Sequence, residues 1–308
     1  AANLVINGGT LSYDGAGHTT NRRFTVGLNG AGLEASGSGA VNFTSTAAIT
    51  HAGTSDRTLT LSGSNTGDNI LTAAIGNAGA GVVSVTKSGD GTWVLSGSNT
   101  YTGETNVTDG KLKITTPSLV DSSTVRIAEG ASLELAYPAS SIDLVNKLVL
   151  DGEDAASGVW GAEGSGASHT SPLLTGTGLI RVAGPFEAWA AGIANGALRD
   201  RGADADGDGV TNLHEFLFGT SAASNTGSLV QSTRSEDGLI LRWHELIAGG
   251  VYQLQESTTL GETPWPVSPV IPTVAVDQSG VPAGYVRKEA VVPVNGAAKF
   301  LRVSGNEQ

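Results

Sequence analysis

The residues best suited to chemistry are carboxylates that alternate along one short stretch of the chain. Asp204, Asp206 and Asp208 are separated by single residues, and Glu215 follows seven positions after the last of them. They fit positions 1, 3, 5 and 12 of a twelve-residue calcium loop, and Gly209 stands at position 6, where the chain must turn sharply. Because Ca²⁺ takes six to eight oxygen ligands, closely spaced carboxylates predict one Ca²⁺ site here.

Two further residues of the same stretch complete the predicted ligand set. Val210 offers its backbone carbonyl, and Asn212 can ligate directly or through water. Glu215 lies one turn into a helix expected over residues 213–218, where it would close the site with two oxygens. The alternative is a solvated acidic loop, which leaves the alternation and the positions of Gly209 and Glu215 unexplained.

This stretch resembles the calcium loops of dockerins and thrombospondin type 3 repeats, including the Asn-Leu-x-Glu-Phe-x-x-Gly-Thr tail over Asn212–Thr220. Dockerins that bind cohesin carry two such loops, whereas this chain has one. A cohesin partner is therefore not expected. The resemblance implies a structural calcium clasp between two β regions.

Catalysis is the rival interpretation, because many β-helices are polysaccharide lyases or hydrolases. Lys and Arg are scattered singly over residues 1–183, apart from Arg22-Arg23, and the neighbours Glu153 and Asp154 would point to opposite faces of a strand. A hydrolytic carboxylate pair could still form across coils. The five histidines show no zinc spacing: His18, His51, His169, His214 and His244. We therefore expect a protein that is not an enzyme.

The elements around these residues are short strands separated by turn residues. Over residues 1–183, runs of Val, Leu and Ile alternate with Asn-Gly, Asp-Gly and Gly-rich pairs. The motif at residues 109–114 is echoed at 129–135, an offset near 20, and Leu-Ser-Gly-Ser-Asn-Thr at 61–66 recurs at 95–100. This repeated pattern of short strands and turns predicts a parallel β-helix of roughly eight coils over residues 1–183, rather than a sandwich. The residues expected to point inward are Leu95, Val107, Leu112, Ile114, Val125, Ile127, Leu133 and Leu135.

The stretch Gly89–Leu112 resembles the autotransporter-associated β-strand repeat, also called the passenger-associated transport repeat. It has the Gly-x-Gly-Thr start, the Leu-Ser-Gly-x-Asn-Thr-Tyr-Thr-Gly centre and the Val-x-x-Gly-x-Leu finish. Residues 158–178 resemble the usual closing stretch of such domains. The resemblance implies a right-handed parallel β-helix at the cell surface of a Gram-negative bacterium, in a structural or adhesive protein.

The remaining chain reads as two shorter parts of an otherwise all-β protein. Residues 184–225 are predicted as a helical segment carrying the calcium loop, with six acidic and two basic residues. Residues 226–308 return to alternating strands and predict a small antiparallel β-sandwich, similar to a C-terminal β module of bacterial secreted proteins. Trp243, Tyr252 and Trp265 could line a sugar platform or fill the sandwich core.

Composition limits the partners and the compartment. The net charge of -12 argues against nucleic acid, the absence of Cys excludes disulfides, and no apolar run reaches the length of a membrane span. The start Ala1-Ala2-Asn3, without Met, predicts a secreted or surface protein after signal-peptide removal. Expected partners are cell-surface or matrix glycans, or copies of itself stacked into filaments or a surface layer through the open solenoid end. The competing interpretation is a monomeric adhesin whose residues 1–7 fold over the first coil.

Overall fold

The computed structural model describes residues 4–224, 228–261, 263–294 and 299–307, and it is mostly β. The chain divides into two compact units, Ala1–Gly184 and Pro185–Gln308. The helical segment expected over 184–225 and the strands expected over 226–308 fall together in the second unit. No helix among the described residues is long and apolar enough to cross a membrane.

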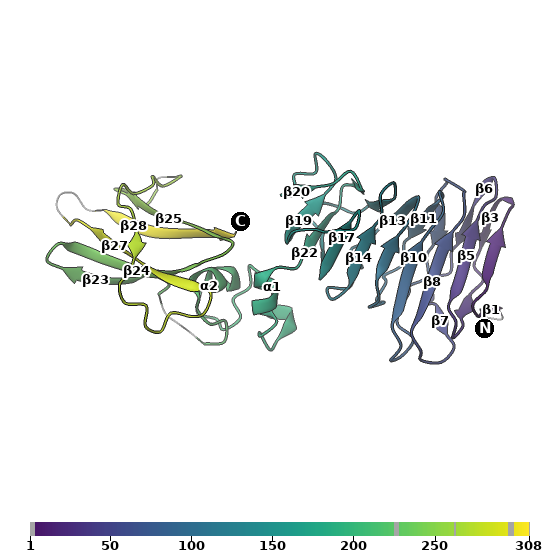
Figure 1. Cartoon of the computed structure of the whole chain (residues 1–308), viewed down its shortest axis with the longest axis horizontal. Helices are drawn as coiled ribbons and strands as arrows, with labels where there is room; N and C mark the ends of the chain where they lie inside the picture. Colours follow the sequence, from purple (N-terminus) through teal and green to yellow (C-terminus); the bar gives the residue numbers. More distant parts are fainter. Residues whose placement is uncertain (1–3, 225–227, 262, 295–298, 308) are drawn as a thin grey trace. The chain divides into compact units, whose positions relative to one another are not determined.

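The first unit is a parallel β-solenoid. In each of two long sheets, seven parallel strands follow one another in chain order, which makes six coil-to-coil steps, and Figure 1 shows β5, β8, β10, β14 and β17 of one sheet side by side. The predicted parallel β-helix is therefore confirmed, with fewer turns than the eight expected. One reason is that the early coils are longer than about 22 residues, since Gly32 pairs with Thr60.

Three sheets make up the solenoid wall. The eight-stranded sheet consists of β2 (Thr10–Tyr13), β5 (Ala31–Ala35), β8 (Arg57–Ser62), β10 (Val83–Lys87), β12 (Thr105–Val107), β14 (Thr124–Ile127), β17 (Lys147–Leu150) and the antiparallel β18 (Glu153–Asp154). The seven-stranded sheet consists of β3 (Ala16–Thr20), β6 (Gly39–Phe43), β9 (Asn69–Leu71), β11 (Thr92–Leu95), β13 (Lys111–Ile114), β15 (Ser132–Leu135) and β21 (Leu174–Gly176). The third sheet consists of β1 (Leu4–Ile6), β4 (Phe24–Val26) and β7 (Thr50–His51).

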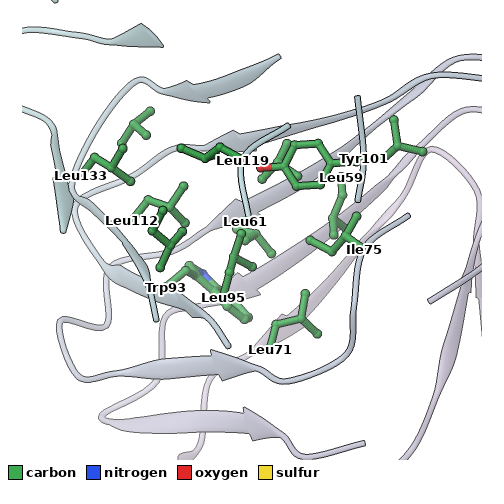
Figure 2. Close-up of a cluster of buried hydrophobic side chains, with 14 of the residues drawn as sticks. Leu59, Leu61, Leu71, Ile75, Trp93, Leu95, Tyr101, Leu112, Leu119 and Leu133 are labelled. Carbon is green, nitrogen blue, oxygen red and sulfur yellow. The ribbon is translucent and has the colours of Figure 1, made fainter. Parts of the chain in front are cut away.

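The core lies between these sheets because the strands alternate apolar and polar residues. Every residue predicted to point inward is buried, from Leu95 to Leu135. Equivalent positions stack directly along the axis, as Leu59 pairs with Val85 on the next coil. Figure 2 shows side chains of both long sheets, such as Leu61 and Leu95, pointing toward one another. Apolar burial of this kind contributes about 25 cal/mol for each Å² removed from water.

Only one of the two internal repeats found in the sequence corresponds to a turn of the solenoid. Leu112 pairs with Leu133 on the next coil, so the offset near 20 is one turn of the solenoid. Leu61 and Leu95, by contrast, lie on β8 and β11 of different sheets. The offset of 34 is therefore not a coil period, although the two segments share the same strand-and-turn chemistry.

Lys87 interrupts an inward column of the solenoid. It stands between Leu61 and Val107 in register and is fully buried. Its Nζ donates to three backbone carbonyls, of Ser88, Gly89 and Asp109. The ammonium therefore satisfies the carbonyls of two successive corners, while burial lowers its pKa to about 8.

The last coil carries an insertion. Leu133 pairs with Leu174, which is 41 residues further along the chain. Three strands of the intervening segment and one strand that follows Leu174 form a sheet that joins parallel and antiparallel pairs and lies at this end of the unit. Its strands are β16 (Ile142–Val145), β22 (Leu179–Val182), β19 (Gly158–Gly161) and β20 (His169–Thr170).

The second unit combines short helices with two antiparallel sheets around one apolar core. The helices are α1 (Pro185–Ala190), the 3₁₀ turn η1 (Gly196–Leu198) and α2 (Asn212–Phe218). One sheet orders β23 (Gln231–Ser235), β24 (Gly238–Leu246), β27 (Tyr285–Val292) and β26 (Thr273–Val274), and the other pairs β25 (Gly250–Ser257) with β28 (Phe300–Glu307). Phe186, Phe216 and Trp243 are buried in this core.

Candidate metal centre

The loop singled out in the sequence lies between η1 and α2. Two of its glycines, Gly207 and Gly209, have φ of 81° and 91°, in the left-handed region where a side chain is strained. Gly209 is the residue expected to permit the sharp turn. The reversal brings the carboxylates before it back toward the first turn of α2.

Asp204 organises the loop through backbone hydrogen bonds. Its Oδ2 accepts from the N–H of Gly209 at 2.8 Å, and its Oδ1 accepts from Gly207 at 2.8 Å and from Asp208 at 3.2 Å. These donors, the Gly209 N–H first among them, lower the pKa of the Asp204 carboxyl below its ordinary value. The carboxylate is therefore held charged and in a fixed direction.

The three aspartates converge. Asp204, Asp206 and Asp208 each offer a carboxylate oxygen, and these oxygens lie within 4.8 Å of one another. No other group of three His, Asp or Glu side chains comes this close within the described part of the chain. Three like charges at such separations repel one another unless a cation lies between them.

Glu215 is the most deeply buried carboxylate of the predicted ligand set. The residue is fully buried, and neither of its carboxylate oxygens has a hydrogen-bond partner; Asp206 Oδ2 is likewise buried without one. Burial, and then the charges of Asp206, Asp208 and Asp204, raise the pKa of Glu215 to about 7. A buried carboxylate without a partner is rare and needs an explanation, and an oxygen-binding dication would supply one.

Asn212 has a different place from the one expected. Its side-chain nitrogen donates to the carbonyls of Leu198 at 2.7 Å and Asp200 at 2.8 Å, and its side-chain oxygen accepts from Ala205 N–H at 3.3 Å. The fully buried amide thus ties the start of the loop to α2. Its role as a metal ligand stays a prediction, as does that of the Val210 carbonyl. The backbone N–H of Val210 donates to Asp208 Oδ1 at 2.8 Å.

The donor set at this loop consists of oxygens only. The oxygens of Asp204, Asp206 and Asp208 converge, the charges of these three act on the buried Glu215, and the predicted set contains no nitrogen or sulfur donor. Such a set suits a hard cation such as Ca²⁺ better than zinc or copper. The residues present therefore fit the ion that the spacing predicts.

The other candidate residues are dispersed. Asp154 pairs with Lys147 at 2.8 Å in the hairpin of β17 and β18. Trp160 stacks on His169, with ring centroids 4.8 Å apart. Asp154 and His169, two of the residues considered in the sequence for catalysis or zinc binding, thus each contact a neighbouring side chain.

The three aromatic residues considered for a sugar platform separate into two groups. Trp243 is 2% exposed and Tyr252 donates its hydroxyl to the carbonyl of Leu217, so both belong to the core of the second unit. Trp265 is partly exposed and has the guanidinium of Arg302 over its ring at 4.6 Å. The prediction that all three aromatic side chains could line one sugar-binding platform is therefore wrong, because Trp243 is buried.

Arg201 is the residue near the loop that sequence reasoning missed. Its guanidinium donates to Glu187 at 2.7 Å and to Glu307, and it lies 4.3 Å from the ring centroid of Phe186. Glu307 is 106 residues away in sequence, so no local pattern could reveal the pair. The sole sequence signal is the position of this arginine, three residues before Asp204.

Comparisons with known proteins agree with the solenoid. The model of the Passenger-associated-transport-repeat family matches residues 85–114, which run from β10 to β13. The adhesin BmaC autotransporter of Brucella suis biovar 1 (strain 1330) is 40% identical over 116 residues, 37% of this chain. The match spans 3% of that relative's own length. No solved structure matches the chain.

Proposed function

We propose that this chain is an adhesive surface protein of a Gram-negative bacterium, in which a β-helix passenger contacts surfaces and does not catalyse a reaction. The observation that carries the proposal is the similarity to an autotransporter adhesin, together with the transport repeat that forms the middle coils. A solenoid suits this task because it presents long sheet faces on a regularly packed core. Glycans of cell surfaces or of the extracellular matrix are the proposed ligands.

The sheet faces offer polar groups in register. On the outer side of the eight-stranded sheet, Thr60, Thr86 and Asn106 follow one another on successive coils, each half-buried. Hydroxyl and amide groups spaced by one strand, about 4.8 Å, can hydrogen-bond repeatedly to an extended polar ligand. This is the kind of surface that an adhesive contact with glycans requires.

Binding of the fluorescently labelled full chain to epithelial cells and to matrix-coated wells tests the proposal. We expect saturable binding that unlabelled chain competes away and that the heat-unfolded chain lacks. The alternative is a polysaccharide-degrading β-helix, which would release reducing ends or unsaturated sugars from a polysaccharide panel. Such release, or binding no stronger than that of albumin, would contradict the proposal.

The loop from Asp204 to Glu215 is proposed to hold one Ca²⁺ that orders the helical segment of the second unit. The support is the convergence of the three aspartates, whose charges act on a buried glutamate that lacks a hydrogen-bond partner. The ion would supply the positive charge that these carboxylates lack, and the chain would supply the oxygens and the turn. The short helical segment and the two antiparallel sheets that share its core then act as one calcium-dependent module, for which a β-sandwich is the proposed form.

Self-association through the first coil is the proposed route to filaments or a surface layer. Among the described residues, β1, β2 and β3 each have a paired neighbour on one side only, and Leu4, Val5 and Leu11 on them are 42%, 57% and 38% exposed. Unpaired strand edges beside apolar side chains gain from a matching partner. Leu4–Ile6 pair in parallel with β4 and extend the solenoid, and residues 1–3 of the proposed N-terminal cap lie outside the described residues.

Sedimentation velocity at rising protein concentration tests this association. The wild-type chain should form larger species, and Leu11→Lys should shift it toward the monomer because a charge on an edge strand opposes pairing. Ile247→Lys is the matched control, since Ile247 is 69% exposed in the second unit. A monomeric wild type at all concentrations, or an equal effect of both variants, would count against the proposed edge.

A further inference from the structure

We propose that the metal loop controls how firmly the last strand, β28, is held, and that Arg201 transmits this control. The inference rests on the Ca²⁺ site proposed above and adds a regulatory role to it. It concerns the second unit alone, where α1, the loop, α2 and β28 meet.

Arg201 joins two elements through one guanidinium. Nη2 donates to Glu187 of α1 at 2.7 Å, and Nη1 pairs with the carboxylate of Glu307 at the end of β28. The side chains of Arg201, Glu187 and Glu307 are 20%, 16% and 23% exposed. In pairs with so little solvent contact, separating one partner is costly because it leaves a charge without compensation, so the pairs depend on the position of each partner.

The backbone around Arg201 is tied to the helix that carries Glu215. The carbonyl of Arg201 accepts from Leu213 N–H at 3.1 Å, and the carbonyl of Ala203 accepts from Asn212 N–H at 2.8 Å. The Asn212 side chain adds its two bonds to Leu198 and Asp200. Residues 198–203 therefore cannot shift independently of the first turn of α2.

β28 has few other attachments among the described residues. It pairs with β25 alone, and a two-stranded sheet is marginal without further packing. Leu301 and Val303 pack partly against the core, and Gly305 lies close to α2, where an added Cβ would be 3.1 Å from the Phe218 ring. α2 and Arg201 are thus important supports of the strand.

A bound cation would neutralise the carboxylates that α2 and the loop bring together. Without it, the three aspartates, whose oxygens lie within 4.8 Å of one another, and the buried, unpartnered Glu215 carry like charges, and their repulsion loosens the first turn of α2 from the loop. That same turn anchors residues 201–203, so its displacement moves the Arg201 guanidinium relative to Glu187 and Glu307. Loss of the ion therefore weakens the attachment of both β28 and α1.

Hydrogen exchange of the full chain, with saturating CaCl₂ and with EGTA, tests this coupling. In the wild type, Ca²⁺ should slow exchange in α2, and it should also slow exchange in α1 and β28 by about tenfold. Arg201→Gln should keep the response in α2 and lose most of it in β28. The matched control is Arg242→Gln, which breaks the pair with Glu289 between β24 and β27 and should keep both responses.

The outcomes separate the coupling from the metal site. A wild type in which α2 responds to Ca²⁺ and β28 does not would overturn the coupling and leave the site standing. Full retention of the β28 response in Arg201→Gln would do the same. Absence of any response in the loop and α2 would overturn the site and the coupling with it. If Arg201→Gln does not fold, Glu307→Gln removes only the β28 side of the link and should give the same loss there.

Discussion

Buried polar side chains in this protein fall into those with partners and those without. Lys87 donates to three carbonyls, and Asp143 accepts from the N–H groups of Ser118 at 2.9 Å and Leu119 at 3.0 Å. Glu215 is as deeply buried and has no such partner. In the solenoid, the buried charges therefore complete corners of the backbone, whereas the one at the loop calls for a ligand.

Asp143 provides a test of burial at the residue scale. It is 5% exposed, and burial raises the pKa of its carboxyl from 3.8 to about 6, against the effect of its two N–H donors. Because the folded-state pKa lies above the unfolded value, the folded state binds more protons between these pH values, and stability falls as pH rises through that window. The ionised form costs roughly 3 kcal/mol at neutral pH.

The change Asp143→Asn should remove this cost while keeping an oxygen that accepts both N–H groups. Urea unfolding at pH 4, 5, 6 and 7 measures it. We expect the variant to gain stability relative to the wild type as pH rises, by up to about 3 kcal/mol. A difference between the two proteins that does not change with pH would show that Asp143 is not buried as described.

At the scale of elements, the spacing between coils is set by close backbone contact at the corners. Gly110 has φ of 59°, and a Cβ added to it would lie 2.4 Å from the carbonyl oxygen of Gly89 on the preceding coil. Gly130 has a similar φ of 78°, but an added Cβ would meet nothing within 4 Å. The two glycines share the same backbone requirement and differ in packing.

Alanine at the two positions should therefore have unequal effects. Gly130→Ala should cost about 1–2 kcal/mol for the left-handed backbone. Gly110→Ala should cost a further ~1–3 kcal/mol, because the coils must move apart. Denaturant unfolding of both variants gives the comparison, and equal losses would contradict the contact between corners.

The elements also show what the sequence could predict. Strand alternation and the offset near 20 predict the solenoid, because each coil needs the same inward residues as its neighbour. The insertion between β15 and β21 was not expected, because its residues alternate strand and turn segments in the same way as the coils do. The positions of Asp204, Asp206, Asp208 and Glu215 follow from a local pattern. The partners of Asn212 and Arg201 depend on tertiary contacts that no spacing encodes.

At the scale of the whole molecule, the solenoid and the loop proposed to bind calcium lie in separate units. Residues 184–225 carry six acidic and two basic residues, while the solenoid satisfies its buried charges with its own backbone. Removal of calcium should therefore affect the two units unequally. The solenoid depends on stacked apolar columns, whereas the second unit would also depend on the ion that the loop is proposed to hold.

Scanning calorimetry of the full chain, with Ca²⁺ and with chelator, tests the proposed centre most directly. An ion at about 100 times its dissociation constant stabilises the folded state by about 2.7 kcal/mol, which raises the unfolding midpoint of a unit of this size by roughly 10 °C. We expect this rise for the transition of residues 185–308 and none for the solenoid, and Glu215→Gln should abolish most of it. Transitions that chelator leaves unchanged in the wild type would contradict the calcium site and the ordering of the second unit that depends on it.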